Sequence, residues 1–240
     1  MNFDEITNFY LENKDVIIPV GIFTLFILIG LISYFFSAKQ RVKRKLSNLR
    51  DQRISSLRNR EFSRITGKAK SFKEPFIAPL SQRKCVFYKV KLEQKKSSGK
   101  NRYWDTIFDI ERFQEFYLEQ NGEYAIVKLT QYPKNFLCHL VVNKKTSSGT
   151  FNDPSPEFEA LLNQHQIKST SFFGLNKQLR YEEAIIEIDE TITVAGTVNY
   201  TTLTEQIEDY SYSKIAELTS TDKQKLIITD LPNVKSKKRR

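Results

Sequence analysis

The clearest pattern along the chain is an uninterrupted apolar run near its beginning. Residues 16–38 carry no charge and are flanked by Asp15 and Lys39. About 20 apolar residues in a helix, each rising 1.5 Å, match the roughly 30 Å hydrocarbon core of a bilayer. A cleaved signal peptide fits less well, because residues 1–15 are acidic and the run is long. The pattern therefore predicts a transmembrane helix over residues 16–38.

The charges that flank this run predict its orientation. Residues 1–15 carry four acids against Lys14, whereas residues 37–64 carry ten lysines and arginines against two acids. Cytoplasmic flanks of membrane helices are enriched in lysine and arginine. We therefore expect a single-pass membrane protein with residues 1–15 outside and the rest of the chain, after the helix, in the cytoplasm.

A basic segment follows the apolar run. Residues 38–62 contain no glycine or proline, which favours a helix, here taken as a juxtamembrane helix over residues 39–63. Two interpretations stay open: the helix continues the anchor as a stiff solvated rod, or it lies on anionic lipid. In the second interpretation, the candidate headgroup contacts are Lys39, Arg41, Lys43, Arg44 and Lys45. The apolar positions form an imperfect stripe, namely Val42, Leu46, Leu49, Ile54 and Leu57.

Beyond residue 64 the apolar positions alternate with a period of two, which is typical of strands. In residues 84–94, Val86, Tyr88, Val90 and Leu92 are expected on one face, and Cys85 and Phe87 on the other. Asn121-Gly122 predicts a hairpin turn within residues 115–129. Further strands are predicted at residues 65–72, 103–112, 136–142, 181–188, 191–198, 210–218 and 225–232.

One helix is expected to interrupt the strands, over residues 153–167. Ser155 would cap it, with Pro156 in its first turn, and Phe158, Leu161 and Leu162 would face a sheet. The predicted fold class is therefore an N-terminal transmembrane α-helix plus a mostly antiparallel β (α+β) domain over residues 64–232. We expect a partly closed barrel or packed sheets with one or two helices.

Net charge adds information about partners. The formal net charge is +10, but it arises from residues 37–64 and from the basic tail, residues 233–240, while residues 65–234 are neutral in sum. The loop at residues 93–102 is also basic and could contact phosphate. Because the bases flank a membrane helix, anionic membrane lipid is the expected partner and nucleic acid an unlikely one.

Several motifs of residues 65–231 resemble the GIDE domain, also called the beside-a-membrane domain. They are a proline-led turn feeding a long strand, "IAPLSQRKCVFYKVKLEQ", a lone tryptophan after a basic loop, "FYLEQNGEYAIV" and "YEEAIIEIDETITVAGTV". That domain occurs in mitochondrial outer-membrane RING-type E3 ubiquitin ligases and in many bacterial membrane proteins. The resemblance assigns a structural role to Pro79, Leu80, Cys85, Tyr88, Trp104, Gly122 and Gly196.

The resemblance implies ubiquitin transfer, but the ligands for that chemistry are too few. A RING binds two zinc ions through eight Cys/His ligands, and the candidates here are Cys85, Cys138, His139 and His165. Cys138 and His139 are adjacent on a predicted strand, so their side chains point to opposite faces. No nucleotide-binding or metalloprotease motif is present. We expect no catalytic, metal or cofactor site.

These observations leave three hypotheses for function. The first is a membrane-anchored binding or scaffolding module with an unidentified protein partner. The second is a component of ubiquitin-like protein transfer without a RING of its own. The third is a basic, membrane-attached nucleic-acid binder. The sequence leaves the oligomeric state open.

Overall fold

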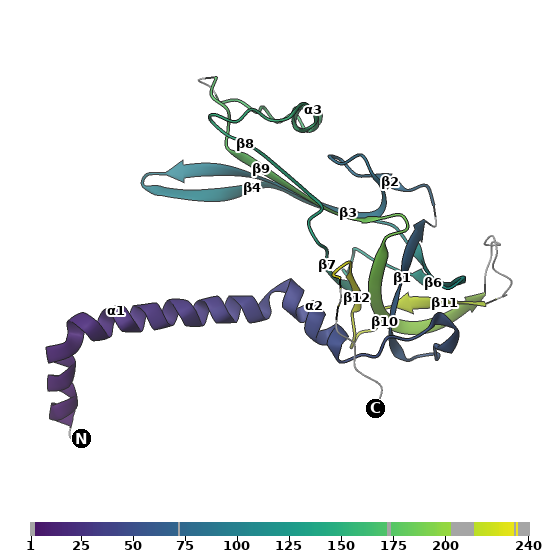
Figure 1. The fold of residues 1–240 in the computed structure, drawn as a ribbon, viewed down its shortest axis with the longest axis horizontal. Helices are drawn as coiled ribbons and strands as arrows, with labels where there is room; N and C mark the ends of the chain where they lie inside the picture. The colour runs from purple at the N-terminus through teal and green to yellow at the C-terminus, as the bar shows by residue number, and fades with distance from the viewer. Residues whose placement is uncertain (1–2, 72, 172–173, 203–213, 233, 235–240) are drawn as a thin grey trace.

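The computed structural model describes residues 3–71, 73–171, 174–202, 214–232 and 234. The basic tail from residue 235 lies outside them. Helix α1 (Phe3–Phe36) projects from a β-rich body, and α2 (Ala38–Ser47) joins it to that body (Figure 1). Pro19 lies inside α1, which bends in its N-terminal half, as expected where proline removes a helical hydrogen bond.

A closed five-stranded barrel forms the part of the body next to α2. Its strands are β1 (Phe62–Ser71), β5 (Phe116–Gln120), β6 (Glu123–Val127), β11 (Lys214–Thr219) and β10 (Thr191–Thr202), in that order. Pairing of β1 with β10 closes it, with Ile65 opposite Val194. β6 and β11 are parallel and the other pairs antiparallel. β12 (Leu226–Thr229) and β7 (Phe136–His139) extend the sheet beyond β10.

A second sheet of five strands lies above the barrel in Figure 1. It contains β2 (Phe76–Ile77), β3 (Lys84–Ser98), β4 (Asn101–Phe113), β9 (Leu179–Glu187) and β8 (Lys144–Ser148). Helix α3 (Pro156–Gln164) packs on this sheet through Phe158, Leu161 and Leu162, as the sequence predicts, and Ser155 caps it. The fold class is therefore confirmed: an N-terminal apolar helix followed by a strand-rich domain with few helices.

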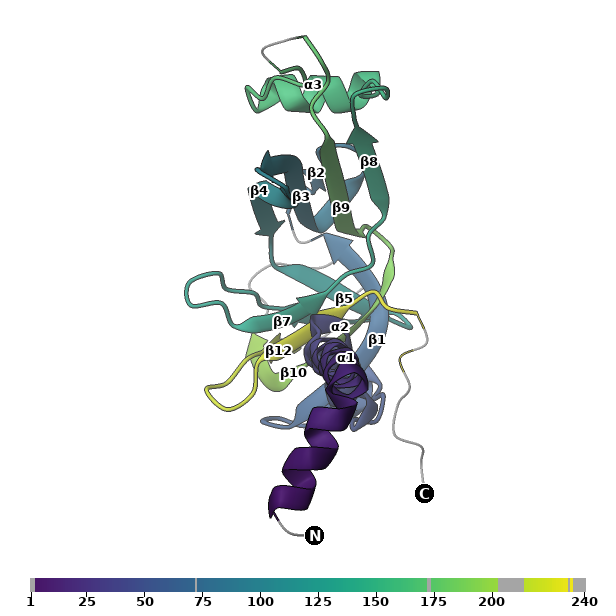
Figure 2. The same ribbon diagram turned by 90° about the vertical axis from the view of Figure 1, so that its left-hand side faces the viewer.

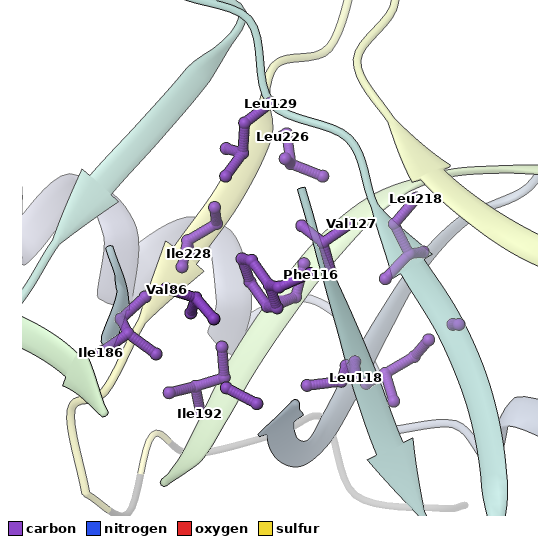
Figure 3. Packing of buried hydrophobic residues seen from close by; sticks show 14 of the residues in the cluster. Val86, Phe116, Leu118, Val127, Leu129, Ile186, Ile192, Leu218, Leu226 and Ile228 are labelled. Atoms are coloured by element: carbon purple, nitrogen blue, oxygen red, sulfur yellow. The ribbon is translucent and has the colours of Figure 1, made fainter. Parts of the chain in front are cut away.

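Two hydrophobic clusters hold the layers together. Figure 3 shows the barrel cluster, where Phe116 and Val127 of the barrel strands meet Val86 and Ile186 from the second sheet. The start of β3 and the end of β9 thus contribute to the barrel core, which attaches the sheet to the barrel. The other cluster joins α3 to β3 and β9, with Tyr181 and Leu92 fully buried.

The expected helix over residues 39–63 is wrong beyond its first nine residues. α2 ends at Ser47, a single 3₁₀ turn, η1, covers Ile54–Ser56, and β1 begins at Phe62. The apolar stripe is imperfect because it serves two elements. Val42 and Leu46 face the barrel from α2, whereas Ile54 and Leu57 enter the barrel core from η1 and the residue that follows it.

The face assignment at the start of β3 is also wrong. Its pairing with β9 shifts between Cys85 and Phe87, and such a bulge reverses the alternation of side chains. Val86 and Phe87 consequently both join the barrel core, while Cys85 joins Tyr88 on the α3 side. The hairpin at Asn121-Gly122 is confirmed, with both residues at positive φ. The short strands β2 and β8 were not predicted.

Candidate functional site

Helix α2 presents two different faces at the point where α1 ends. Val42 and Leu46 are fully buried against Ala195 and Ile227 of the barrel sheet. Of the predicted lipid-contacting residues, Lys39, Arg41, Arg44 and Lys45 are exposed and Lys43 is half-buried. Arg44 lies opposite the buried face, whereas Lys39 lies beside Val42 on the same side of the helix. A basic surface therefore lies on a helix that is packed against the domain.

Hydrogen bonds fix the junction between α1 and α2. The Oγ of Ser37 accepts from Gln40 N at 3.4 Å and caps α2. Arg44 Nη2 donates to the carbonyl oxygen of Phe35 at 2.7 Å, and cations are favourable at the end of a helix, where carbonyl groups lack partners. The basic face of α2 thus begins directly at the end of the apolar helix.

Arg64 is the residue of this basic segment whose role the sequence does not reveal. It is 4% exposed and does not belong to the basic surface. Its Nη1 donates to Leu46 O at 3.0 Å and its Nη2 to Val234 O at 2.7 Å. Burial lowers the pKa of the guanidinium, and nearby Asp51 opposes that effect. Arg64 therefore connects the end of α2 to the C-terminal segment.

A cleft of about 360 Å³ lies between the second sheet and β7, beside the start of α2. Ala38, Lys89, Asp109 and His139 are among its lining residues. Burial lowers the pKa of His139, and Lys39 and Lys43 lower it further. His139 is therefore neutral at physiological pH. Residues of α2, β7 and the second sheet line the cleft together, and they include both positively and negatively charged side chains.

The cysteines are not activated for nucleophilic chemistry. Burial raises the pKa of the Cys85 thiol to about 12 and also raises that of Cys138. Because the thiolate is the reactive form, both thiols stay protonated at neutral pH. They lie on different sheets and are free. Within the described ranges, no group of three or more His, Cys, Asp or Glu side chains could hold a metal ion.

The proline-led turn before β3 is held by a buried carboxylate that sequence reasoning missed. Glu183 on β9 is fully buried, and its two oxygens accept from Leu80 N at 2.8 Å and Ser81 N at 3.1 Å. Pro79 and Tyr88 line a groove of about 320 Å³ between the turn, β4 and α3. The one sequence signal for the burial of this carboxylate is the alternation of apolar residues along β9, which places Glu183 on the same face as Leu179 and Tyr181.

The other residues to which the resemblance assigns a structural role lie in different parts of the fold. Trp104 is on the β3–β4 hairpin, where the Arg180 guanidinium stacks on its ring at 4.1 Å. Gly122 provides the positive φ of the β5–β6 turn. At Gly196 a Cβ would approach Leu226 Cδ1 to 2.6 Å and Thr219 O to 3.1 Å, so a larger residue there would displace its neighbours in the barrel wall. Pro79, Leu80, Cys85 and Tyr88 form one neighbourhood, which Trp104, Gly122 and Gly196 do not share.

The described part of the chain contains one helix long and apolar enough to cross a membrane, Glu12–Phe36. Its large apolar side chains, such as Phe23, Phe26 and Phe36, are exposed rather than packed on the domain. Soluble proteins seldom expose so large a contiguous apolar surface. Comparison of the whole chain with protein-family models, curated proteins and solved structures gives no match.

Proposed function

We propose that this chain is a single-pass membrane protein that presents its barrel and second sheet, on the cytoplasmic side, as a binding or scaffolding module. One observation carries the proposal. The basic helix α2 follows the apolar helix directly and packs its apolar face on the barrel. The domain is therefore coupled to the anchor through a packed element instead of a flexible linker.

The electrostatics of α2 support this arrangement. Helix α2, which carries the exposed lysines and arginines, follows the apolar helix after a single residue, Ser37. Each base near an anionic surface contributes about 1 kcal/mol of attraction, and bases on this flank favour a cytoplasmic location. The α2 surface would hold the domain close to lipid headgroups, while α3 lies at the end of the body away from α2 (Figure 1).

A binding role accounts for the described site better than an enzymatic one. The thiols are protonated, His139 is neutral, and the charged groups in the cleft are spread over several strands. The groove is lined by Pro79, Tyr88 and Ile110 together with Arg112 and His165, a mixture of apolar and polar groups typical of ligand sites. The resemblance to the GIDE domain stays a prediction and suggests the same class of role.

The orientation is tested by the accessibility of a tag placed after Arg240. A tag in the cytoplasm is reached by an antibody or protease only after the membrane is permeabilised. The matched control places the same tag before Met1, where it is reached in intact cells. A C-terminal tag cleaved in intact cells would contradict the proposed orientation.

The binding role is tested by crosslinked co-purification with two baits, the full chain and residues 1–37. The shorter bait stops before α2 because Val42 and Leu46 need the barrel to cover them. We expect proteins that are captured by the full chain alone, enriched reproducibly over the anchor. Identical capture by both baits would contradict a recruiting module.

A further inference from the structure

The tip of the β3–β4 hairpin stands apart from the rest of the second sheet. β9 pairs with β3 as far as Gln94, and Lys95 N donates to Gln178 O just before β9 at 2.8 Å. Beyond this bond, residues 96–98 pair with residues 101–103 alone. This arm and α1 project from the same side of the body, as both ribbon views show (Figures 1 and 2). An anchor that crosses a membrane therefore directs the arm toward the same membrane.

The arm tip is basic. Residues 95–104 contain Lys95, Lys96, Lys100 and Arg102 and no acid. Lys96 pairs with Asp105 at 2.5 Å. In the part of the chain that the structure describes, no ion pair involves the other three bases. Three positive charges are thus available to an external anion.

Aromatic side chains accompany these bases. Tyr103 is 49% exposed and Trp104 37% exposed, and both residue types favour the interface between water and hydrocarbon. Ile107, further along β4, is also exposed. The bases Lys95 and Arg102, with Ser97 and Gln178, line a polar hollow of about 290 Å³ beside Trp104. Such a hollow has the donors to bind a phosphate group.

We propose that the tip of the β3–β4 hairpin, residues 95–104, is a second membrane contact that binds anionic lipid headgroups, with Tyr103 and Trp104 at the interface. Its positive charge complements anionic lipid, and its direction is shared with α1. The inference rests on the proposed function, because it takes α1 as the membrane anchor. Together, α1 and the arm would fix the rotation of the domain about the anchor.

Trp104 makes this contact directly measurable, because it is the only tryptophan in the chain. The full chain is reconstituted into bilayer nanodiscs of mixed phosphatidylcholine and phosphatidylglycerol, or of phosphatidylcholine alone. Bromine-labelled lipid in each disc quenches tryptophan that reaches the interface. We expect quenching and a blue shift of Trp104 emission in the anionic discs, and less of both in the neutral discs.

The double variant Lys100→Gln/Arg102→Gln tests the contribution of charge. Lys95 is kept because its ammonium lies over the Trp104 ring at 5.9 Å and its loss would itself change the emission. The control Arg53→Gln/Arg58→Gln removes two exposed charges that flank η1, which packs against β6 at the end of the barrel away from α1. For each tip charge removed, we expect the equilibrium constant for docking of the arm on anionic lipid to fall about fivefold. The control should leave Trp104 quenching unchanged.

The outcomes separate the two proposals. A chain that does not enter the discs contradicts the membrane anchor and hence the proposed function. A chain that enters them with Trp104 unquenched overturns the arm contact alone. Equal quenching in anionic and neutral discs, or equal loss in tip variant and control, overturns recognition of anionic headgroups. A response of Trp104 to an oligonucleotide but not to anionic discs would also overturn the proposal, in favour of nucleic acid.

Discussion

Three charged side chains hydrogen-bond the backbone of neighbouring segments; Arg64 and Glu183 are buried and Asp230 is half-buried. Arg64 donates to Leu46 O and Val234 O, and Glu183 accepts from the turn at Leu80. Both oxygens of Asp230 accept from Val141 N, at 2.8 and 3.0 Å. Backbone groups that are away from water need partners, so the buried charges of Arg64 and Glu183 stabilise backbone that no strand pairing satisfies.

Replacing Glu183 by alanine should destabilise the second sheet. The change leaves Leu80 N and Ser81 N without an acceptor inside the protein, which costs about 2 kcal/mol or more. The measurement is urea unfolding of the full chain in detergent, followed by circular dichroism. The matched control is Glu182→Ala, whose carboxylate pairs with exposed Lys145. An equal effect of the two changes would contradict the role given to Glu183.

Asp230 should make stability fall as the pH rises from acid toward neutral. Burial raises the pKa of Asp230 from its ordinary value of 3.8 to about 6. Between about pH 4 and pH 6, the Asp230 carboxyl thus keeps its proton in the folded chain but loses it in the unfolded chain. The contribution of Asp230 to the free energy of unfolding is therefore fully present below about pH 4 and lost by about pH 6.

Asp230→Asn removes this titration and keeps an acceptor oxygen for Val141 N. Relative to the unmodified chain, the variant should gain on the order of 2 kcal/mol between pH 4 and pH 7. The measurement is denaturant unfolding at both pH values, with exposed Asp222→Asn as the control. A difference that does not change with pH would show that Asp230 titrates normally.

At the scale of elements, α2 is a short helix that depends on its neighbours. Ten residues are marginal for an isolated helix in water. Ser37 caps its start, Arg44 bonds the end of α1, and Val42 and Leu46 are covered by the barrel. Tertiary packing therefore decides its length and its position.

Leu46→Ala should weaken the packing of α2 on the barrel and lower stability, while leaving the charges of the helix unchanged. Leu46 is fully buried, and truncation of a buried leucine costs about 3 kcal/mol through lost contacts and a cavity. Lys45→Ala is the matched control, because Lys45 is exposed on the same turn and should change stability by less than about 0.5 kcal/mol. Thermal unfolding in detergent measures both. Similar melting of the two variants would show that α2 is not docked.

At the scale of the whole molecule, a closed barrel is joined to a sheet with an unpaired edge. β10 pairs with β1, β11 and β12, whereas among the described strands β4 pairs only with β3. Closure removes free edges from the barrel, so the barrel forms the stable base of the domain. The projecting β3–β4 arm has few contacts with other strands, and we expect it to be the less stable part.

This difference should be visible in amide hydrogen exchange of the full chain. Peptides that cover residues 192–198 of β10 should exchange on the order of 100-fold more slowly than peptides that cover residues 101–105 of β4, because local opening is easiest where few contacts must break. Mass spectrometry resolves both regions in one experiment. Equal protection of the two regions would contradict a barrel that is more stable than the arm.

The same exchange experiment, repeated with the chain in anionic nanodiscs, would also test the proposed contact between the arm and lipid. Slower exchange in residues 95–104 with anionic lipid is the expected result, while β10 should not change.

Local patterns were sufficient for the elements that depend on near neighbours in the chain. Uninterrupted apolar residues predicted the N-terminal helix, alternation predicted most strands, and Asn121-Gly122 and Ser155-Pro156 marked a turn and a helix start that the structure confirms. These signals are local because hydrogen bonding in helices and tight turns links residues a few positions apart.

The sequence by itself thus determined the apolar helix, the strand-rich domain and the placement of basic residues beside the helix. Only the tertiary structure decided the closure of β1 on β10, the end of α2 at Ser47, the bulge at Cys85 and the burial of Arg64 and Glu183. Each of these depends on contacts between residues far apart in the chain. Side-chain alternation and helix propensity carry no information about which distant surface will cover a face, and that surface decides burial, strand register and helix length.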